Sequence, residues 1–380
     1  MGEICKYLNC TGCGACSVIC PSHCVTMVPD EYGFYHPEIK KSQCIGCNLC
    51  RKKCPQNNKD NNMLPRKVLA AWNKNLDERK SSSSGGIAAG FYQYALEHEY
   101  YICGTKLCEG TTLQHMITRN EKDRESFKGS KYVQSLAYPI FGEIQSVLKD
   151  KKKVLFVGTP CQVAGLFAFL GKSYPNLITV DLVCHGVPSQ RFLSEHVDSI
   201  THMDSADISI TFRDERGWYL DIKKNGTSVY RSPAHEDFYY EGFLNSLFYR
   251  ESCYYCKYAC IERIADITIG DFWGLGKLKS VSYPTEKVSL VLVNSHKGEK
   301  FWEEATQLFI FEERSIEEAI IDNDQLVHPS DYNQFTTRFK TLYRDYGFEH
   351  AAKKCLGKAV LKHKKEVFFR KLKYKMCRKG

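Results

Sequence analysis

Two runs of four cysteines, each closed by a proline, constrain this chain more than any other feature of its sequence. Both runs read C-x2-C-x2-C-x3-C-P, the first ending at Cys20-Pro21 and the second at Cys54-Pro55. In this spacing three neighbouring thiolates bind three corners of one [4Fe–4S] cluster, and the fourth cysteine binds the other cluster. The first cluster is assigned to Cys10, Cys13, Cys16 and Cys54. The second cluster is assigned to Cys44, Cys47, Cys50 and Cys20.

A zinc site and a disulfide framework are the alternatives for these cysteines. The chain has 380 residues and 19 cysteines, and its first residues do not read as a signal peptide. Cysteines in such a chain are expected in a reducing cytoplasm, where they serve as metal ligands rather than disulfides. No apolar stretch approaches the length needed to span a bilayer. The chain is therefore expected to be a cytoplasmic protein that transfers electrons.

The sequence divides into a small cysteine-rich part and a longer part with a different pattern. We expect an α+β ferredoxin-like domain with two [4Fe–4S] clusters at residues 1–60, with a hairpin at 30–35, followed by a polar linker. From residue 65 to 340, apolar strands alternate with helices, which predicts a larger α/β domain with parallel pairing and a mixed sheet. The expected strands are 68–72, 154–158, 177–183, 208–212, 219–223, 264–269 and 288–294, and the expected helices are 87–98 and 162–170.

Two loops of the larger domain have the composition of anion-binding loops. The first is Ser82-Ser83-Ser84-Gly85-Gly86, which opens a predicted helix, so its amides and hydroxyls are suited to a phosphate. A flexible linker is the alternative, because serine–glycine runs are usually mobile. The second loop contains Gly129, Ser130, Lys131 and Tyr132 and suits phosphate or flavin contacts.

Four further cysteines are candidates for a third [4Fe–4S] cluster: Cys161, Cys184, Cys253 and Cys256. Cys161 lies between Thr159 and Gln162, where a buried strand meets a helix, and ligands collect at such strand ends. Cys260 competes for one of the four ligand positions. The same residues also suit a zinc ribbon at 253–260, or a nucleophilic Cys161 paired with His185.

His185 and Asp271 are the candidates for proton handling. Each follows a predicted strand, His185 directly after Cys184. The alternatives are that His185 tunes a neighbouring cluster and that Asp271 caps the loop after its strand.

Together these motifs resemble the beta-subunit family of coenzyme F-420 hydrogenases and dehydrogenases. The resemblance extends over roughly residues 65–310, and the motifs occur in family order at 82–86, 129–135, 158–162, 184–186, 253–259 and 270–274. It implies a noncovalent FAD bound by the two loops with Thr159 and Gln162. It also implies a [4Fe–4S] cluster near the flavin, held by the four further cysteines, and hydride exchange at FAD.

The expected function is that of an iron–sulfur flavoprotein oxidoreductase. It would pass electrons between a ferredoxin-type carrier, or another redox partner protein, and a small-molecule hydride donor or acceptor such as coenzyme F-420. Flavin suits this junction because it accepts a hydride and releases single electrons. The alternative is an electron-transfer subunit without its own substrate site, which connects a partner enzyme, for instance in polysaccharide biosynthesis, to ferredoxin.

Residues 341–380 are expected to form a basic helical tail. They carry 13 Lys and Arg against 3 Asp and Glu, while the whole chain has a net charge of +9. The rest is thus nearly neutral, and no nucleic acid partner is expected. Leu356, Val360, Phe368, Leu372 and Met376 recur at steps of four or eight, as in an amphipathic helix. Such a helix can pack on its own domain, contact the inner membrane face, or bind an acidic partner.

Overall fold

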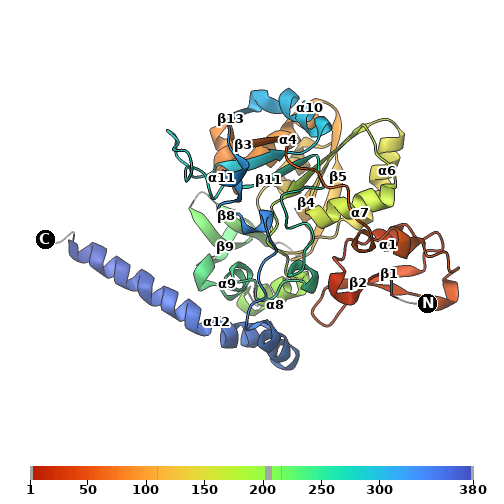
Figure 1. The fold of residues 1–380 in the computed structure, drawn as a ribbon. Coiled ribbons are helices and arrows are strands. Elements are labelled where there is room, and N and C mark those ends of the chain that lie inside the picture. Colours follow the sequence, from red (N-terminus) through yellow and green to blue (C-terminus); the bar gives the residue numbers. More distant parts are fainter. Residues whose placement is uncertain (1–2, 109, 202–207, 215, 378–380) are drawn as a thin grey trace.

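The chain folds into a small N-terminal lobe and a large lobe that lie side by side (Figure 1). The computed structural model describes residues 3–108, 110–201, 208–214 and 216–377, and of residues 368 and 370–377 only the backbone is described. Helix α1 (Ala15–Val18) of the N-terminal lobe packs against helix α7 (Pro160–Leu170) of the large lobe.

The N-terminal lobe, residues 3–60, has the α+β organisation that the sequence predicts. Strands β1 (Val25–Pro29) and β2 (Tyr35–Ile39) pair antiparallel, with the predicted turn at 30–35 between them. Helix α2 (Leu49–Lys52) lies in the second cysteine run, as α1 lies in the first. The buried core contains Ile4, Val25 and the cysteines Cys16, Cys20, Cys24 and Cys54. The core of this lobe is therefore made largely of thiols.

An eight-stranded mixed sheet forms the centre of the large lobe, with the strand order β13-β3-β12-β11-β7-β6-β4-β5. Strands β4, β6, β7 and β11 run parallel to one another, and their remaining neighbours pair antiparallel. The strands are β3 (Lys67–Asn73), β4 (Tyr100–Leu107), β5 (Leu113–Thr118), β6 (Lys153–Gly158), β7 (Leu177–Leu182), β11 (Ile267–Asp271), β12 (Ser289–Val293) and β13 (Phe309–Glu313). The predicted parallel pairing and mixed sheet are confirmed.

Helices cover both faces of this sheet. The side chains of β6 and β7 alternate between the two faces, so Leu155 and Ile178 join the core under one pair of helices while Val154 and Leu177 join the core under the other. The first pair is α4 (Ile87–Glu97) and α10 (His296–Ala305), and the second is α6 (Phe141–Lys149) and α7. The shorter helices of this lobe are α3 (Leu76–Ser81), α5 (Glu121–Phe127) and α11 (Ile316–Ile320).

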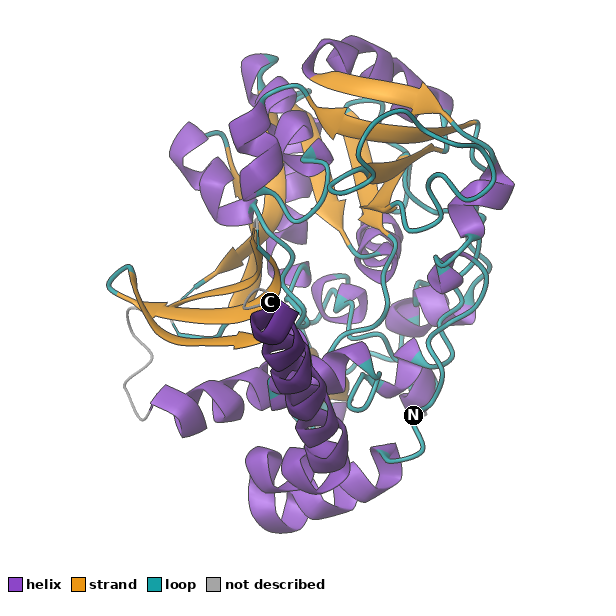
Figure 2. Cartoon of the chain, turned by 90° about the vertical axis from the view of Figure 1, so that its left-hand side faces the viewer, coloured by secondary structure: helices purple, strands orange, loops and turns teal. Residues whose placement is uncertain are grey.

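A second, three-stranded sheet and an aromatic core form the part of the large lobe below the main sheet (Figure 2). Its strands are antiparallel: β8 (Ile208–Asp214), β9 (Gly217–Lys224) and β10 (Thr227–Pro233). Helices α8 (Gln190–Thr201), α9 (Phe238–Leu244) and α12 (Thr336–Cys377) pack here. Phe192, Phe212, Tyr239, Phe248 and Phe348 belong to their shared core.

The C-terminal helix α12 confirms the predicted helical tail but begins at Thr336, before residue 341. Gly347 interrupts it with φ 76° and ψ −179°. Leu356 and Val360 are buried, so this stretch packs on its own lobe, and the helix then projects away from the molecule (Figure 1). The side chains of Phe368, Leu372 and Met376 lie outside the described part. Within the described residues, no helix combines the length and apolarity that crossing a membrane requires.

Two predicted element boundaries move for local reasons. The helix predicted at 162–170 begins at Pro160, because Thr159 caps it and proline is favoured in the first turn. The strand predicted at 264–269 is β11, Ile267–Asp271. The residues directly before β11 do not extend it, since the Asp266 carboxylate accepts hydrogen bonds from the N–H and hydroxyl of Thr179 and Arg263 pairs with Met63.

Candidate functional site

The cysteines assigned to the first cluster lie together in the N-terminal lobe. Burial raises the pKa of Cys16, and the negative charges of Cys13, Cys10 and Cys54 raise it further. Burial likewise raises the pKa of Cys13 to about 12. Hydrogen bonds from the Cys5 thiol instead lower the pKa of Cys10 and of Cys54. A group of four sulfurs, of which two favour the thiolate form, fits an iron centre.

The cysteines assigned to the second cluster form a separate group. Cys20, Cys44, Cys47 and Cys50 line one small cavity. Burial raises the pKa of Cys50, and the charges of Cys20, Cys47 and Cys44 add to this effect. The structure thus places Cys20 with the second run and Cys54 with the first, in the arrangement that the spacing predicts. The ligand roles themselves stay predictions.

A third group of cysteines lies in the large lobe, where β6 and β7 end. It consists of Cys161, Cys184, Cys253 and Cys256. Burial raises the pKa of Cys253, and the charges of Cys184, Cys256 and Cys161 raise it further. Among the described residues, no three His, Cys, Asp or Glu side chains are arranged to hold a single metal ion. A four-iron cluster makes a different demand, because each thiolate binds a different iron.

Cys260, the competitor for a ligand position, points elsewhere. Its Sγ lies 3.5 Å from the carbonyl oxygen of Lys257 and 3.1 Å from that of Glu262. The thiol therefore donates to the backbone of its own loop. This placement favours Cys256 over Cys260 in the third group.

Thr159 and Gln162, the predicted flavin contacts, also hold the first turn of α7 and thus Cys161. The two residues form a capping box in which the Thr159 N–H donates to Gln162 Oε1 at 2.9 Å. Gln162 Nε2 also donates to the carbonyl oxygen of Ser135 at 3.0 Å. Thr159 Oγ1 lies 3.2 Å from Cys161 Sγ.

Arg263, which no sequence motif indicated, holds segments next to the third group in place. Its guanidinium donates to the Tyr258 carbonyl oxygen at 2.9 Å and to Asp181 Oδ1 at 3.1 Å. Burial raises the pKa of Cys184, and the charge of Arg263 offsets part of that rise. No sequence signal distinguishes this arginine from the many surface arginines.

The first and third cysteine groups lie next to each other across the interface between the lobes. Gly165 follows Cys161 by one helical turn, on the same face of α7. A Cβ atom at Gly165 would lie 2.8 Å from the Cβ of Cys13, so the glycine permits this close approach. Burial raises the pKa of Tyr258, and the charges of Cys161 and Cys13 add to this rise. The Tyr258 hydroxyl has no hydrogen-bond partner within the described protein.

Arg250 ties the N-terminal lobe to the large lobe. This buried side chain donates through Nε to the carbonyl oxygen of Cys10 at 2.6 Å and through Nη2 to that of Tyr35 at 2.8 Å. Gln134 Nε2 donates to the carbonyl oxygen of Thr11 at 3.0 Å. Lys257 pairs with Asp60 at 2.6 Å. These contacts fix the first cysteine group relative to the third.

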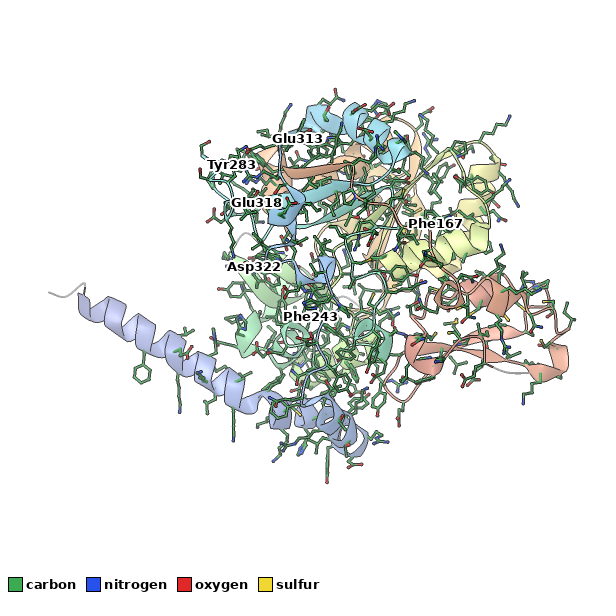
Figure 3. The ribbon with its side chains drawn as sticks, in the orientation of Figure 1. Phe167, Phe243, Tyr283, Glu313, Glu318 and Asp322 are labelled. Carbon is green, nitrogen blue, oxygen red and sulfur yellow. The ribbon has the colours of Figure 1, made fainter. Side chains whose placement is uncertain are left out.

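A cavity of about 1290 Å³ opens beside the third group, and Cys184 is part of its wall. Asp322 and Phe243, which also line it, lie between the main sheet and α12 in the view of Figure 3. Among the predicted site residues it is lined by Ser82, Ser83, Ser84, Gly86, Gly129, Ser130, Lys131, Tyr132, Thr159, Gln162, His185 and Asp271. Gly85 packs behind the wall, where a Cβ atom would lie 2.5 Å from the Ala71 carbonyl oxygen.

The serine–glycine loop and the first turn of α4 line this cavity. Gly86, with φ +80°, precedes α4 without a side-chain cap, and Ile87, Ala88 and Ala89 line the cavity. Amides in the first turn of a helix have no partner within the helix and are suited to bind an anion. The Ser83 hydroxyl accepts from the Ser130 N–H at 2.6 Å and so joins the two loops.

Lys131 stabilises its own loop in this structure. Its Nζ donates to the carbonyl oxygens of Phe127, Lys128 and Gly129, at 3.3, 2.8 and 3.2 Å. Burial lowers the pKa of Lys131 to about 8. As placed, its ammonium group has no N–H left for the phosphate contact that the sequence suggested.

The two candidates for proton handling have different surroundings. Loss of solvation lowers the pKa of His185, so its imidazole is neutral at pH 7. Asp271 Oδ2 accepts from Arg213 Nη1 at 2.6 Å, and the Arg213 guanidinium lies 4.3 Å from the ring centre of Trp218. Arg213 and Trp218 also line the cavity. No motif pointed to them, since they lie on β8 and β9 of the small sheet, outside the segments that carry the motifs.

Comparison with known proteins finds matches for both parts of the chain. Residues 151–319 match the family described as the C terminus of the coenzyme F420 hydrogenase/dehydrogenase beta subunit, and residues 9–58 match the 4Fe-4S dicluster domain. The chain is 24% identical over 174 residues to the F subunit of the F(420)H(2) dehydrogenase of Methanosarcina mazei, covering 43% of this chain and 49% of the relative.

Two further likenesses extend over more of the chain. The coenzyme F420-dependent sulfite reductase of Methanocaldococcus jannaschii is 23% identical over 328 residues, which cover 79% of this chain and 46% of the relative. The chain thus spans about half the length of these two relatives. A chain of the solved F420-reducing [NiFe] hydrogenase complex from Methanosarcina barkeri is 18% identical, with a TM-score of 0.46 over 77% of this chain and 91% of that chain.

Proposed function

We propose that this chain is an iron–sulfur flavoprotein oxidoreductase. The premise is that residues 151–319 match the C-terminal domain family of the coenzyme F420 hydrogenase/dehydrogenase beta subunit and residues 9–58 match the 4Fe-4S dicluster domain. In this proposal electrons pass between a one-electron carrier and a hydride donor or acceptor at FAD. The observation that carries it is the cavity that joins the glycine loops at 82–86 and 129–132 to Cys184.

The size of the cavity favours a site with its own substrate. Pockets for small molecules usually enclose about 300–1,000 Å³. The volume of about 1290 Å³ leaves room for a dinucleotide cofactor and a second organic molecule. An electron-transfer subunit that only connects a partner enzyme to ferredoxin needs no such additional space.

The chain supplies the groups that such a site needs. The first-turn amides of α4 would bind the pyrophosphate of FAD, and the aromatic rings of Tyr132 and Trp218 offer flat apolar surfaces in the same cavity. Bound FAD supplies hydride exchange on one side and single-electron transfer on the other. The neutral His185 can accept a proton at a ring nitrogen, and Arg213 holds the Asp271 carboxylate in place.

The positions of the three cysteine groups support one order of electron transfer. Cys184 of the third group lines the cavity, and Cys161 lies one helical turn from Gly165, which contacts Cys13 of the first group. Cys54 of the first group is only four residues from Cys50 of the second. We propose the order cavity, third group, first group, second group, with the external carrier at the second group.

The test is whether flavin binds in this cavity and is chemically competent there. After anaerobic reconstitution we expect about twelve irons and about one FAD per chain. The names of the relatives make reduced coenzyme F420 the first hydride donor to test, with NADH as the comparison. Bleaching of the flavin absorbance by one of these donors, followed by reduction of the clusters, supports the proposal.

A pair of tryptophan substitutions on one helix tests the location. Ala88→Trp narrows the cavity at the first turn of α4, and we expect flavin affinity to fall by at least about tenfold. Glu97→Trp changes the exposed last turn of the same helix and should leave flavin affinity unchanged. A chain that takes up iron but no flavin, or equal flavin affinity in both variants, would contradict the proposal.

A further inference from the structure

One end of the N-terminal lobe carries a concentrated positive charge. Residues 40–53 contain five basic residues and no acidic one. The five are Lys40, Lys41, Arg51, Lys52 and Lys53, and all five are exposed. We call residues 40–53 the basic face. Because it surrounds the second cysteine run, its charge lies around the predicted second cluster.

The second cysteine group is the most exposed of the three. Cys47 is exposed, whereas Cys10, Cys16 and Cys54 of the first group are buried. Next to Cys47, Ile45 is 69% exposed, and a Cβ atom at Gly46 would meet nothing within 4 Å. A protein that exchanges electrons with this chain can therefore approach a cluster most closely at the loop 45–48.

The charges of the basic face are not consumed by ion pairs within the chain. In the described part of the structure, Lys40, Lys41, Lys52 and Lys53 have no acidic partner within ion-pair distance. Arg51 donates to a backbone carbonyl, that of Glu3, at 2.7 Å. A groove of about 430 Å³ lies alongside, lined in part by Lys6, Arg51 and Lys52, with Glu3 as its one acidic residue.

An exposed apolar side chain, here Ile45, surrounded by charges of one sign is typical of a transient protein interface. From this arrangement we infer that the basic face is the docking surface for an acidic one-electron carrier protein. The carrier's acidic side chains pair with the five cations, and its redox centre lies over the exposed loop at 45–48. This inference rests on the proposed function, because it assigns the second cluster the exchange of electrons with the outside.

The test measures binding with both proteins oxidised, so that no electron passes and the chemistry at the cavity does not enter. The probe is an acidic two-cluster ferredoxin, titrated onto the reconstituted full chain at about 50 and about 300 mM salt. We expect affinity to fall steeply as salt rises. Lys41→Glu/Lys52→Glu should weaken binding at low salt by at least about tenfold. The control Lys354→Glu/Lys358→Glu makes the same charge change on exposed residues of α12 and should stay within about twofold.

Several results would overturn the inference. One is that ferredoxin does not bind at low salt, or binds with an affinity that does not depend on salt. Another is that both double variants weaken binding equally. A third is that the lysines bind anionic lipid vesicles while ferredoxin does not bind. Should the glutamate variant lose iron, Lys41→Gln/Lys52→Gln replaces it, with the same direction expected. Ferredoxin binding in a chain that lacks flavin chemistry would support the docking surface and contradict the proposed function, so the two failures are distinguishable.

Discussion

Buried and partly buried arginines join parts of the candidate site that lie far apart in the chain. Arg250 donates to the backbone of Cys10, Arg263 to Asp181, and Arg213 to Asp271. A guanidinium that leaves water needs oxygen partners, and each of these has carbonyl or carboxylate oxygens around it. Such a side chain therefore fixes the distance between the two segments that it bridges. Arg250 and Arg263 thus position segments that carry cysteines, and Arg213 positions Asp271.

The choice between Cys256 and Cys260 predicts a difference in iron content. Cys256→Ala should lower the iron of the reconstituted chain from about twelve to about eight atoms, because one ligand of the third cluster is lost. Cys260→Ala should retain the full iron content, since the Cys260 thiol is directed to backbone carbonyls. Iron and acid-labile sulfide assays give the readout. The reverse pattern would exchange the roles of the two cysteines.

The helix α12 is partly a core element and partly a projecting one. Beyond the kink at Gly347 it buries Phe348, Ala351, Leu356 and Val360 in the aromatic core. The basic tail expected from residue 341 therefore begins inside a packed helix. Each buried large apolar side chain contributes about 1.5–3 kcal/mol. A truncation that tests the projecting part must leave these residues in place.

The imidazole of His196 on α8 links two neighbouring helices and makes this packing dependent on pH. Its Nε2 lies 2.8 Å from Asp237 Oδ2 at the start of α9, and its Nδ1 contacts Glu349 of α12. Burial opposes the charged imidazole, but Asp237 and Glu349 outweigh this effect and raise the pKa of His196 to about 9.

Because this folded-state pKa lies above the ordinary value of 6.5, the stabilisation is complete below pH 6.5 and is lost as pH rises through 9. We expect a contribution of at most about 3 kcal/mol, lowered by the partial exposure of Glu349. Thermal unfolding midpoints should fall between pH 6.5 and 9.5, and His196→Gln should reduce this slope. An unchanged slope in the variant would assign the pH dependence to other groups.

The interface between the two lobes combines one close contact with hydrogen bonds and an ion pair from the large lobe. Helix α7 carries Cys161 at its start and touches Cys13 one turn later, at Gly165. Arg250 and Lys257 connect the large lobe to backbone or side-chain oxygens of the N-terminal lobe. This arrangement brings the predicted first and third clusters close together.

Gly165→Ala tests whether this close approach matters. The added methyl group would meet Cys13 and separate the lobes, at a cost of about 1–3 kcal/mol that exceeds the gain in helix propensity of about 1 kcal/mol. We expect a lower unfolding midpoint and slower reduction of the third cluster by a carrier. Gly142→Ala on α6, where a Cβ atom meets nothing within 4 Å, is the matched control and should lower neither. Equal unfolding midpoints and equal reduction rates in the two variants would show that the contact between Gly165 and Cys13 is not tight.

Most residues of the candidate site could be predicted from local sequence patterns, but their arrangement in space could not. The cysteine spacings predict the grouping of eight residues because ligands of one cluster lie within ten residues, apart from the crossed fourth cysteine. Thr159 and Gln162 illustrate the limit. Their position after a strand suggested ligand binding; they line the cavity and also form the cap that holds Cys161. Both uses share one local sequence, so the pattern alone did not indicate the cap.

The sequence by itself determined the iron–sulfur character of the N-terminal lobe, the parallel core of the sheet and the basic helix at the end. These depend on residue types at short fixed intervals, where neighbours in the chain are also neighbours in space. Only the tertiary structure decided that Gly165 meets Cys13, that Arg213 holds Asp271 and that the glycine loops share one cavity with Cys184. Such contacts follow from how whole helices and sheets pack their apolar faces, and no local pattern records that packing.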